Sequence, residues 1–413
     1  MGDVGGRQLK AAQYDRKAVR TMGIDKAVFW QLAVTVFGPG SSRLWEKAEG
    51  FDTVEEFTEA LVGGAVDGLT EGERDRIERY GLKECGDILK GCKNEGLEYM
   101  CFDDPGYPER LRYVKDPPAM LYFKGDAGLL DRTVIHITGT RDPSSYSVQT
   151  AEAFCGGMFE RGMVPSSGFA EGIDRTVCEL AVKSGQPTVA VTAYPFSVDS
   201  PKGTMELKEE IARKGLVISE YYPGCRPAPN NFKARNRIAV GIAAGVLFIE
   251  CSKESRGLDN LNKAMEYKRP VFAVPPHDIF DERYSGQAMM IESGRAMAVT
   301  GTASIAAALE GGIKTAAPVR ESGRVRIPRR AGEKKNARAE VRPELTEKPA
   351  GKTVQRPGGI QGQIYDILKG RTLTVDEIAG AAGLDITTVL SQLMMMELSG
   401  TVRSLPGKRY AAD

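Results

Sequence analysis

The residues best suited to chemistry in this sequence lie where an apolar run gives way to small and charged residues. In the stretch Thr133–Arg141, the apolar run ends in Gly139, Thr140 and Arg141. A glycine at the end of a buried parallel strand lets backbone N–H groups approach an anion, and a guanidinium can pair with a phosphate through two hydrogen bonds. The pattern predicts a phosphate-binding loop, although a purely structural turn would use the same residues.

Two further stretches have a similar composition. Ser166–Asp174 also follows an apolar run, and a tight strand-to-helix turn is its structural alternative. Asn231–Arg237 combines amides, one aromatic ring and several cations, which stack on bases and hold phosphates, or else form a solvated helix surface. We expect the three loops to converge on one anion. The candidate nucleic-acid-binding residues are Gly139, Thr140, Arg141, Ser167, Gly168, Lys202, Asn231, Phe232, Arg235, Asn236 and Arg237.

The histidines argue against an enzyme. The chain has two, His136 in an apolar run that predicts a packed strand and His277 among prolines, so no Ser-His-Asp set or metal-binding pair is evident. No Gly-x-Gly-x-x-Gly follows the first strand, which weakens a dinucleotide-binding interpretation. Gly351–Thr353 resembles the end of an ATP-binding loop, but Thr346 stands where that loop begins with glycine. We expect no enzymatic activity, no cofactor and no metal.

Apolar segments of strand length alternate with helical patterns from residue 133 to about residue 309. This alternation predicts an α/β fold, an extended Rossmann-like doubly wound parallel sheet with helices on both faces. Ligands of such sheets bind beyond the carboxyl ends of the strands, where the strand order reverses. The predicted strands are Val134–Thr138, Met163–Pro165, Thr188–Thr192, Leu216–Ser219, Gly245–Glu250 and Val271–Val274, with an added strand at Met120–Lys124.

Composition and periodicity divide the chain into four parts. Residues 1–98 predict a small helical domain of the SAM or helix-hairpin-helix type, and residues 99–312 the Rossmann-like domain. Residues 313–358 predict a basic flexible linker. From Lys314 to Arg356 there are thirteen Lys and Arg and five Glu, a local charge of +8, so the remainder of the chain carries −7. Nucleic-acid binding by the folded part would therefore need a focused pocket.

Residues 359–413 predict a winged helix-turn-helix. A capping box at Thr374–Glu377 opens the second helix, and a hairpin from Thr401 to Tyr410 turns at Pro406–Gly407. We expect the outward face of the third helix to meet another protein rather than duplex DNA. That helix has Ile386, Val389, Leu390 and Leu393 on its predicted inner face and Thr387, Thr388, Ser391 and Gln392 on its outer face.

The composition is that of a soluble globular protein, with 41% hydrophobic and 27% charged residues. No apolar segment reaches the length of a membrane span, and the first residues lack an apolar signal region, so we expect a cytoplasmic protein. The seven cysteines include no Cys-x-x-Cys pair and are odd in number, which predicts reduced thiols.

The order and spacing of these motifs resemble the DNA processing protein family DprA, also called Smf, from Pro105 to about Ala298. The helical domain and the winged helix fit the layout of the same family. The matching segments are Tyr107–Leu111, Asp116–Pro118, Gly139–Arg141 where the family usually has Gly-Ser-Arg, Ser167–Asp174, Ser219–Glu220, Phe232–Ile238 and Phe272–Pro275.

The resemblance implies a homodimeric protein that binds and protects single-stranded DNA and loads the recombinase RecA during natural transformation and recombination. The residues that it implies for contacts with phosphates and bases are Arg141, Lys202, Phe232, Arg235 and Arg237, with Gly139, Thr140, Ser167 and Gly168 shaping the pocket. The chain departs from the family pattern at Cys178, where His is usual, and at Ser255–Leu258, where a Ser-Gly-Ser/Thr stretch is usual.

Two other functions use the same kind of sheet. One is a nucleotide phosphoribohydrolase of the lysine-decarboxylase-like group, but its Pro-Gly-Gly-x-Gly-Thr motif is absent from the sequence. The other is a nucleotide sensor whose winged helix regulates transcription. For the DprA-like function, we expect binding that is insensitive to base sequence and weakened by salt, because phosphate contacts dominate the affinity.

Overall fold

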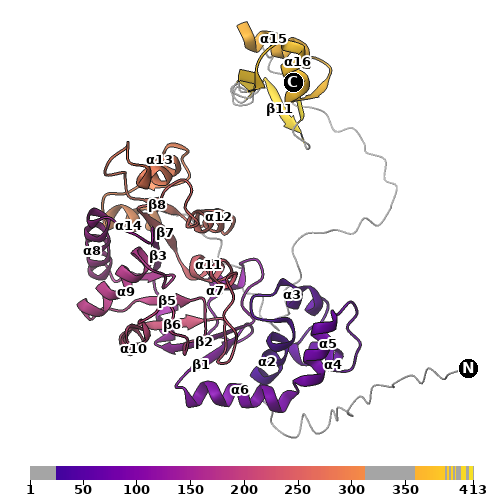
Figure 1. Cartoon of the computed structure of the whole chain (residues 1–413), viewed down its shortest axis with the longest axis vertical. Helices are drawn as coiled ribbons and strands as arrows, with labels where there is room; N and C mark the ends of the chain where they lie inside the picture. The colour runs from indigo at the N-terminus through magenta and orange to yellow at the C-terminus, as the bar shows by residue number, and fades with distance from the viewer. Residues whose placement is uncertain are drawn as a thin grey trace, which may run out of the picture. The chain divides into compact units, whose positions relative to one another are not determined.

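The chain folds as two units, each with its own sheet (Figure 1). The computed structural model describes residues 25–311, 359–386, 388–389, 392–393, 396, 401–405 and 409–412. The units are Met1–Glu333 and Lys334–Asp413, and the division falls within the predicted linker. The domain boundaries after residues 98, 312 and 358 stay predictions.

A nine-stranded sheet is the centre of the first unit. Its order is β1-β2-β6-β5-β4-β3-β7-β8-β9, with β2 antiparallel to both of its neighbours, β1 and β6, and all other neighbouring strands parallel. The doubly wound sheet predicted from sequence is confirmed, whereas β1 and β9 were not predicted. The strands are Glu98–Cys101 (β1), Met120–Gly125 (β2), Val134–Gly139 (β3), Val164–Ser167 (β4), Val189–Thr192 (β5), Leu216–Ser219 (β6), Gly245–Ile249 (β7), Val271–Ala273 (β8) and Met297–Ala298 (β9).

The strand order reverses between β3 and β7. From β3 the chain builds β4, β5 and β6 on one side, then crosses to build β7, β8 and β9 on the other. A crevice forms where two such crossovers leave in opposite directions, beyond the carboxyl ends of the two central strands. The loops after β3 and β7 therefore border the natural ligand site of this sheet.

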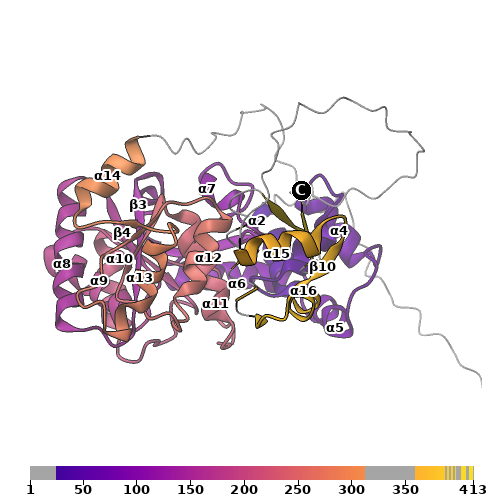
Figure 2. The same ribbon diagram turned by 90° about the horizontal axis from the view of Figure 1, so that it is seen from above.

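Alternate residues of the central strands pack against helices on opposite faces, as the two-residue repeat of a strand requires. Leu247 and Ile249 share a buried cluster with α8, α9 and α14, whereas Val246 and Phe248 share another with α11, α12 and α13. Figure 2 shows α11 and α12 side by side. The helices of the Rossmann-like part, with its two short 3-10 helices, are α7 (Glu109–Arg112), η1 (Ala127–Asp131), α8 (Ser145–Glu160), α9 (Ile173–Ser184), α10 (Met205–Lys214), α11 (Asn231–Ile242), α12 (Leu258–Glu266), η2 (Glu282–Tyr284), α13 (Ser285–Glu292) and α14 (Thr302–Glu310).

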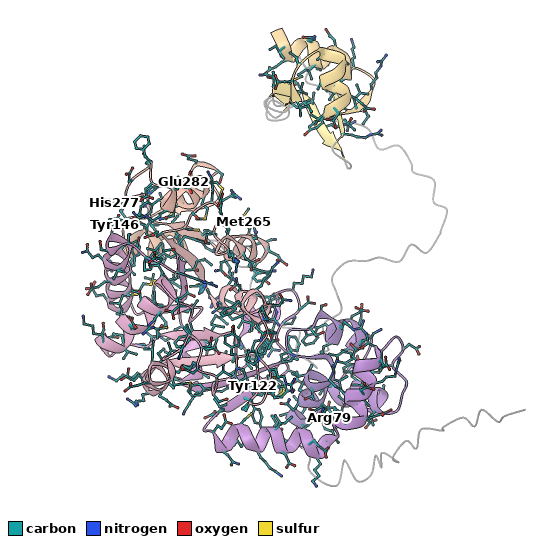
Figure 3. The ribbon with its side chains drawn as sticks, in the orientation of Figure 1. Arg79, Tyr122, Tyr146, Met265, His277 and Glu282 are labelled. Carbon is teal, nitrogen blue, oxygen red and sulfur yellow. The ribbon has the colours of Figure 1, made fainter. Side chains whose placement is uncertain are left out.

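The helices before β1 share one hydrophobic core with the sheet. They are α2 (Lys26–Phe37), α3 (Ser42–Ala48), α4 (Val54–Val62), α5 (Glu71–Arg79) and α6 (Leu82–Asn94). A single buried cluster runs from α2 to β2, β5 and β6. Within it Tyr122 of β2, labelled in Figure 3, donates a buried hydrogen bond to Gln31 of α2 at 2.7 Å. Trp45 of α3 donates to the carbonyl of Pro117 at 2.8 Å.

The second unit has the winged-helix outline predicted from sequence. Thr374 and Glu377 form the predicted capping box at the start of α16, which ends at Gly383 with φ 67°. The predicted hairpin is present as β11 and β12, with β10 as an unpredicted third strand. The elements are α15 (Gly359–Leu368), β10 (Thr372–Thr374), α16 (Val375–Ala382), β11 (Val402–Leu405) and β12 (Arg409–Ala412).

One core assignment in this unit was wrong. Val389 and Leu393 are buried as predicted, but Ile386 is 50% exposed. Asp385 accepts a hydrogen bond from the backbone N–H of Thr388, as a helix cap does, so Ile386 is in the first turn and outside the buried stripe. The predicted positions at Thr387, Leu390, Ser391 and Pro406–Gly407 lie outside the described residues.

Candidate nucleic-acid interface

A pocket of about 710 Å³ opens at the carboxyl ends of β3, β4 and β7. Residues of all three predicted loops line it, at the point where the strand order reverses. From the predicted set, the lining includes Gly139, Thr140, Arg141, Gly168, Phe232, Arg235 and Asn236.

Close backbone packing holds the loop after β3. The N–H of Thr140 donates to the carbonyl of Glu250 at 2.8 Å, and the carbonyl of Thr140 accepts from the N–H of Ile173 at 3.1 Å. A side chain at Gly139 would overlap the carbonyl oxygen of Ile249 and approach Ile173 Cγ1 to 2.7 Å. Glycine is therefore required at this strand end by contacts within the fold, in addition to any ligand.

The loop after β4 encloses a buried acid and a buried base. The backbone N–H groups of Gly168 and Ala170 donate to Asp174, whose pKa is raised by burial. Arg235 approaches this carboxylate and donates to the carbonyl of Val191 at 2.7 Å, and burial lowers the pKa of its guanidinium. A Cβ at Gly168 would overlap Arg235 Nη1 and lie 2.6 Å from Asp174 Oδ2, so only glycine leaves room here for both side chains. Arg235 thus belongs to the inner wall of the pocket and supports the fold.

The rim carries an exposed cation and an aromatic side chain together. The Arg141 guanidinium lies 5.9 Å from the centre of the Phe232 ring, and Tyr194 packs edge-on against Phe232 at 5.1 Å. A second hollow of about 420 Å³ continues from the pocket past this pair, lined also by Pro227–Pro229 and Arg256. Arginine with an aromatic face is the combination that holds a phosphate and an adjacent base.

Four predicted binding residues do not line the pocket. Ser167 is buried under the loop, with its hydroxyl 3.3 Å from Cys178 Sγ, and Asn231 is buried at the start of α11. Lys202 is exposed and lies outside the pocket lining. Arg237 is buried in an ion pair with Glu220 at 2.6 Å. Burial lowers the pKa of Arg237, but this carboxylate outweighs it and holds the pKa above its ordinary value.

Three pocket cations were not among the predicted set: Lys233, Arg256 and Arg283. Lys233 lies within Phe232–Ile238, one of the segments that match the family pattern. Arg256 lies within Ser255–Leu258, which departs from that pattern. Four carboxylates also line the pocket, so its wall is not uniformly positive. They are Glu171, Asp174, Glu250 and Asp259.

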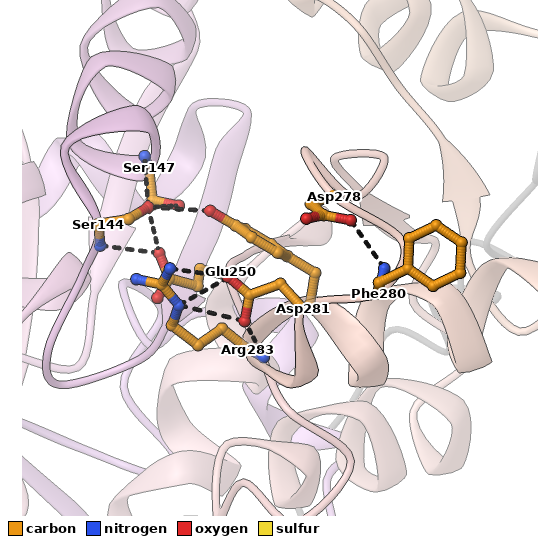
Figure 4. A network of polar contacts seen from close by, with 8 residues as sticks. Ser144, Ser147, Glu250, Asp278, Phe280, Asp281 and Arg283 are labelled. Carbon is orange, nitrogen blue, oxygen red and sulfur yellow. Dashed lines mark hydrogen bonds and ion pairs between the residues drawn. The ribbon is translucent and has the colours of Figure 1, made fainter.

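A polar network connects the pocket wall to the segment before α13 (Figure 4). Glu250 accepts from the backbone N–H and the hydroxyl of Ser144 at 2.9 and 2.7 Å. That hydroxyl lies 3.0 Å from the Tyr284 hydroxyl, and Arg283 pairs with Asp281 at 2.7 Å. Glu250 is therefore fixed against the start of α8.

His136 lies in the pocket floor but is a packed strand residue, as predicted. It is 1% exposed, and burial together with the charge of Arg235 lowers its pKa to about 3. The ring is thus neutral and remains unsuited to proton transfer near neutral pH. Within the described residues, no group of three or more His, Cys, Asp or Glu is placed to hold a metal, and no helix has the length and apolar character of a membrane span.

The fold defines a class of protein in which a doubly wound sheet, open at its switch point, is joined to a winged helix. Residues 98–310 match the family model for DNA recombination-mediator protein A, and residues 348–408 match the DprA winged helix domain. The chain belongs to the DprA family.

Relatives from distant bacteria support this assignment. DNA processing protein DprA of Streptococcus pneumoniae is 34% identical over 261 residues, covering 57% of this chain and 92% of that protein. Protein Smf of a Synechocystis species is 26% identical over 416 residues, covering 94% of this chain and 99% of that protein. The X-ray structure of Streptococcus pneumoniae DprA matches with a TM-score of 0.56 at 26% identity, covering 70% of this chain and 95% of that chain.

Proposed function

We propose that this protein binds single-stranded DNA at the switch-point pocket and its rim, and that it mediates recombination of the bound strand. The observation that carries the proposal is the Arg141–Phe232 pair at the mouth of the pocket. A duplex hides the faces of its bases, whereas a single strand can place a base against Phe232 while Arg141 holds the adjacent phosphate. The family description as a DNA recombination mediator supports a DNA substrate and a role in recombination.

The finer parts of the proposal rest on the family resemblance. We propose that the protein acts in the cytoplasm as a homodimer, protects incoming single strands and loads RecA onto them during transformation. We also propose that it is not an enzyme, since the histidine in its pocket is buried and neutral. Lys202 remains a proposed contact, for which the strand would have to extend beyond the pocket, whereas we propose that Arg237, buried in its ion pair with Glu220, supports the fold instead of contacting the strand.

Fluorescence anisotropy with labelled oligothymidine and with a matched duplex, over a range of salt concentrations, tests the proposal. We expect salt-sensitive binding to the single strand and much weaker binding to the duplex. Arg141→Ala should weaken binding, and it should reduce the slope of log affinity against log salt concentration by about one. The matched control is Arg213→Ala, an exposed arginine at the end of α10 that does not line the pocket. Equal affinities of the two variants would contradict the proposed site.

A further inference from the structure

A buried lysine lies beneath the loop that carries Lys202. Lys208 belongs to α10, and its side chain is 1% exposed. Its ammonium group donates to the carbonyl of Phe196 at 3.2 Å and to the carbonyl of Val198, and it lies 3.6 Å from Met205 Sδ. An ammonium group has three N–H donors, so each of them has an acceptor here. Two of these acceptors belong to the backbone of the loop, which the lysine therefore ties to α10.

The ammonium group of Lys208 also faces two aromatic rings. It lies 5.8 Å from the centre of the Phe169 ring and 6.0 Å from the centre of the Phe196 ring, and both rings are buried. The attraction between a cation and an aromatic face is strongest where water is excluded. Phe169 lies in the loop after β4, next to Gly168 in the pocket lining. Lys208 thus connects α10 with the loops that follow β4 and β5.

Lys208 keeps its charge at neutral pH. Burial lowers the pKa of Lys208 to about 8, although the charge of Asp199 opposes this shift. The amine is therefore mostly protonated at pH 7 and keeps its third N–H donor. A side chain of similar length without donors, such as methionine, would remove the hydrogen bonds to both loop carbonyls at once.

The start of this loop is fixed beside the rim of the pocket. The carbonyl of Tyr194 accepts from the hydroxyls of Thr192 and Ser219, both at 2.8 Å. The Tyr194 ring packs edge-on against Phe232 at 5.1 Å. The first residues of the loop therefore belong to the rim itself, whether or not Lys208 is present.

The end of the loop is a tight turn that carries Lys202. Asp199 accepts from the backbone N–H of Gly203 at 2.8 Å, and the exposed Lys202 lies between these two residues. Val198 immediately precedes Asp199, so the hydrogen bond from Lys208 to the Val198 carbonyl holds the base of this turn. The position of Lys202 relative to the sheet therefore depends on Lys208.

We propose that Lys208 is a positioning residue for strand binding, whose buried ammonium group fixes the loop so that Lys202 faces a phosphate of the strand beyond the pocket. The carboxyl ends of β4 and β5 lie side by side because the two strands are parallel, so the loop after β5 lies next to the pocket. This inference rests on the proposed function, in which Lys202 contacts the strand. Lys208 itself is covered by the loop and does not touch the strand.

A double-mutant cycle between Lys202 and Lys208 tests this inference, by fluorescence anisotropy with labelled oligothymidine at pH 7 over a range of salt concentrations. Lys202→Ala should weaken binding about 5-fold and reduce the slope of log affinity against log salt concentration by about one. Lys208→Met should have the same two effects, although its side chain is buried. The variant with both substitutions should bind as either single variant does, because a lysine that is not held in place has no contact left to lose.

Lys214→Met is the matched control, since it removes an exposed lysine from the end of the same helix, and it should leave affinity and slope unchanged. Hydrogen exchange provides an independent measurement. Lys208→Met should speed the exchange of backbone amides in residues 193–204 and leave the exchange of α8 unchanged. If Lys208→Met does not fold, Lys208→Gln, which keeps N–H donors in the buried site, takes its place with the same expected results.

The outcomes separate this inference from the proposed function. Losses that add in the double variant, wild-type binding by Lys208→Met, or unchanged exchange of the loop would overturn the positioning role while leaving strand binding in place. Wild-type binding by Lys202→Ala would also overturn it, because there would be no contact to position. Failure of the wild type to bind any strand would overturn the proposed function and this inference with it.

Discussion

Arg237→Ala is expected to destabilise the fold rather than to remove a DNA contact. The guanidinium of Arg237 lies 2.6 Å from Glu220, and the two side chains are 8% and 4% exposed. Removing one partner of a buried ion pair costs about 3–5 kcal/mol, because the other charge stays buried without compensation. Arg237 Nη1 and Glu220 Oε2 already lack hydrogen-bond partners, so we expect the lower end of this range, about 3 kcal/mol.

Urea unfolding followed by tryptophan fluorescence measures this cost, since Trp30 and Trp45 are buried in the same unit. Replacement of both Glu220 and Arg237 by Leu should recover most of the lost free energy of unfolding, because apolar residues often replace a buried ion pair without loss of stability. Lys202→Ala, at an exposed lysine from the same predicted binding set, should leave the free energy of unfolding unchanged.

Binding of oligothymidine by the Arg237→Ala variant decides whether Arg237 supports the fold or contacts DNA. At urea concentrations well below the transition, we expect Arg237→Ala to bind oligothymidine as the wild type does. An Arg237→Ala protein that unfolds at the wild-type urea concentration and yet loses its affinity for the strand would refute this reasoning. It would show that Arg237 contacts DNA, as the family motif implies.

Three other substitutions, one of them with a control substitution, test the site and the residues that support it. Phe232→Ala should weaken binding of oligothymidine about 10-fold, since one stacked base contributes about 1–3 kcal/mol, and unchanged anisotropy curves would exclude stacking there. Gly139→Ala should lower the melting temperature because its Cβ would overlap the Ile249 carbonyl, whereas Gly156→Ala, with open space around its position in α8, should be neutral or stabilise by up to about 1 kcal/mol. Calorimetry that finds equal melting temperatures for the two variants would contradict the close packing. Burial lowers the pKa of His136 to about 3 from an ordinary value of 6.5, so the unfolded chain takes up a proton that the folded chain excludes. The contribution of His136 to stability is therefore complete above pH 6.5 and is lost as the pH falls toward 3, at up to about 1.4 kcal/mol per pH unit. His136→Asn should flatten that decline in urea titrations, and an unchanged slope would count against a neutral buried ring.

The sequence predicts the sheet well because its central strands are buried on both faces and are therefore mostly apolar. β7 is a continuous apolar run that ends before Glu250, and β3 ends at Gly139, although His136 and Thr138 interrupt its apolar residues. The edge strands escape prediction for the opposite reason. β9 contains two exposed residues, and β1 pairs antiparallel with β2 through contacts that are set by the tertiary fold rather than by its own pattern.

The candidate site is predicted less completely than the fold. Motifs identify the loops, but they do not separate Arg235 and Arg237, which are two residues apart in one helix and both buried. The two arginines differ in their surroundings. Arg235 lines the pocket, whereas Arg237 forms an ion pair with Glu220, the residue that follows β6. The orientation of the Glu250 carboxylate depends on a hydrogen bond from Ser144, which is 106 residues away in the sequence. No local pattern carries that information.

The helices before β1 and the sheet share one hydrophobic core, and this affects how the protein unfolds. Tyr122 and Trp45 make buried hydrogen bonds across the junction, and one apolar cluster passes through it. Because neither side can lose its partner without exposing this cluster to water, the helices and the sheet should melt in a single calorimetric transition. Recombination between related genes near residue 98 would then tend to yield chains that fail to fold, so the two parts should be inherited together.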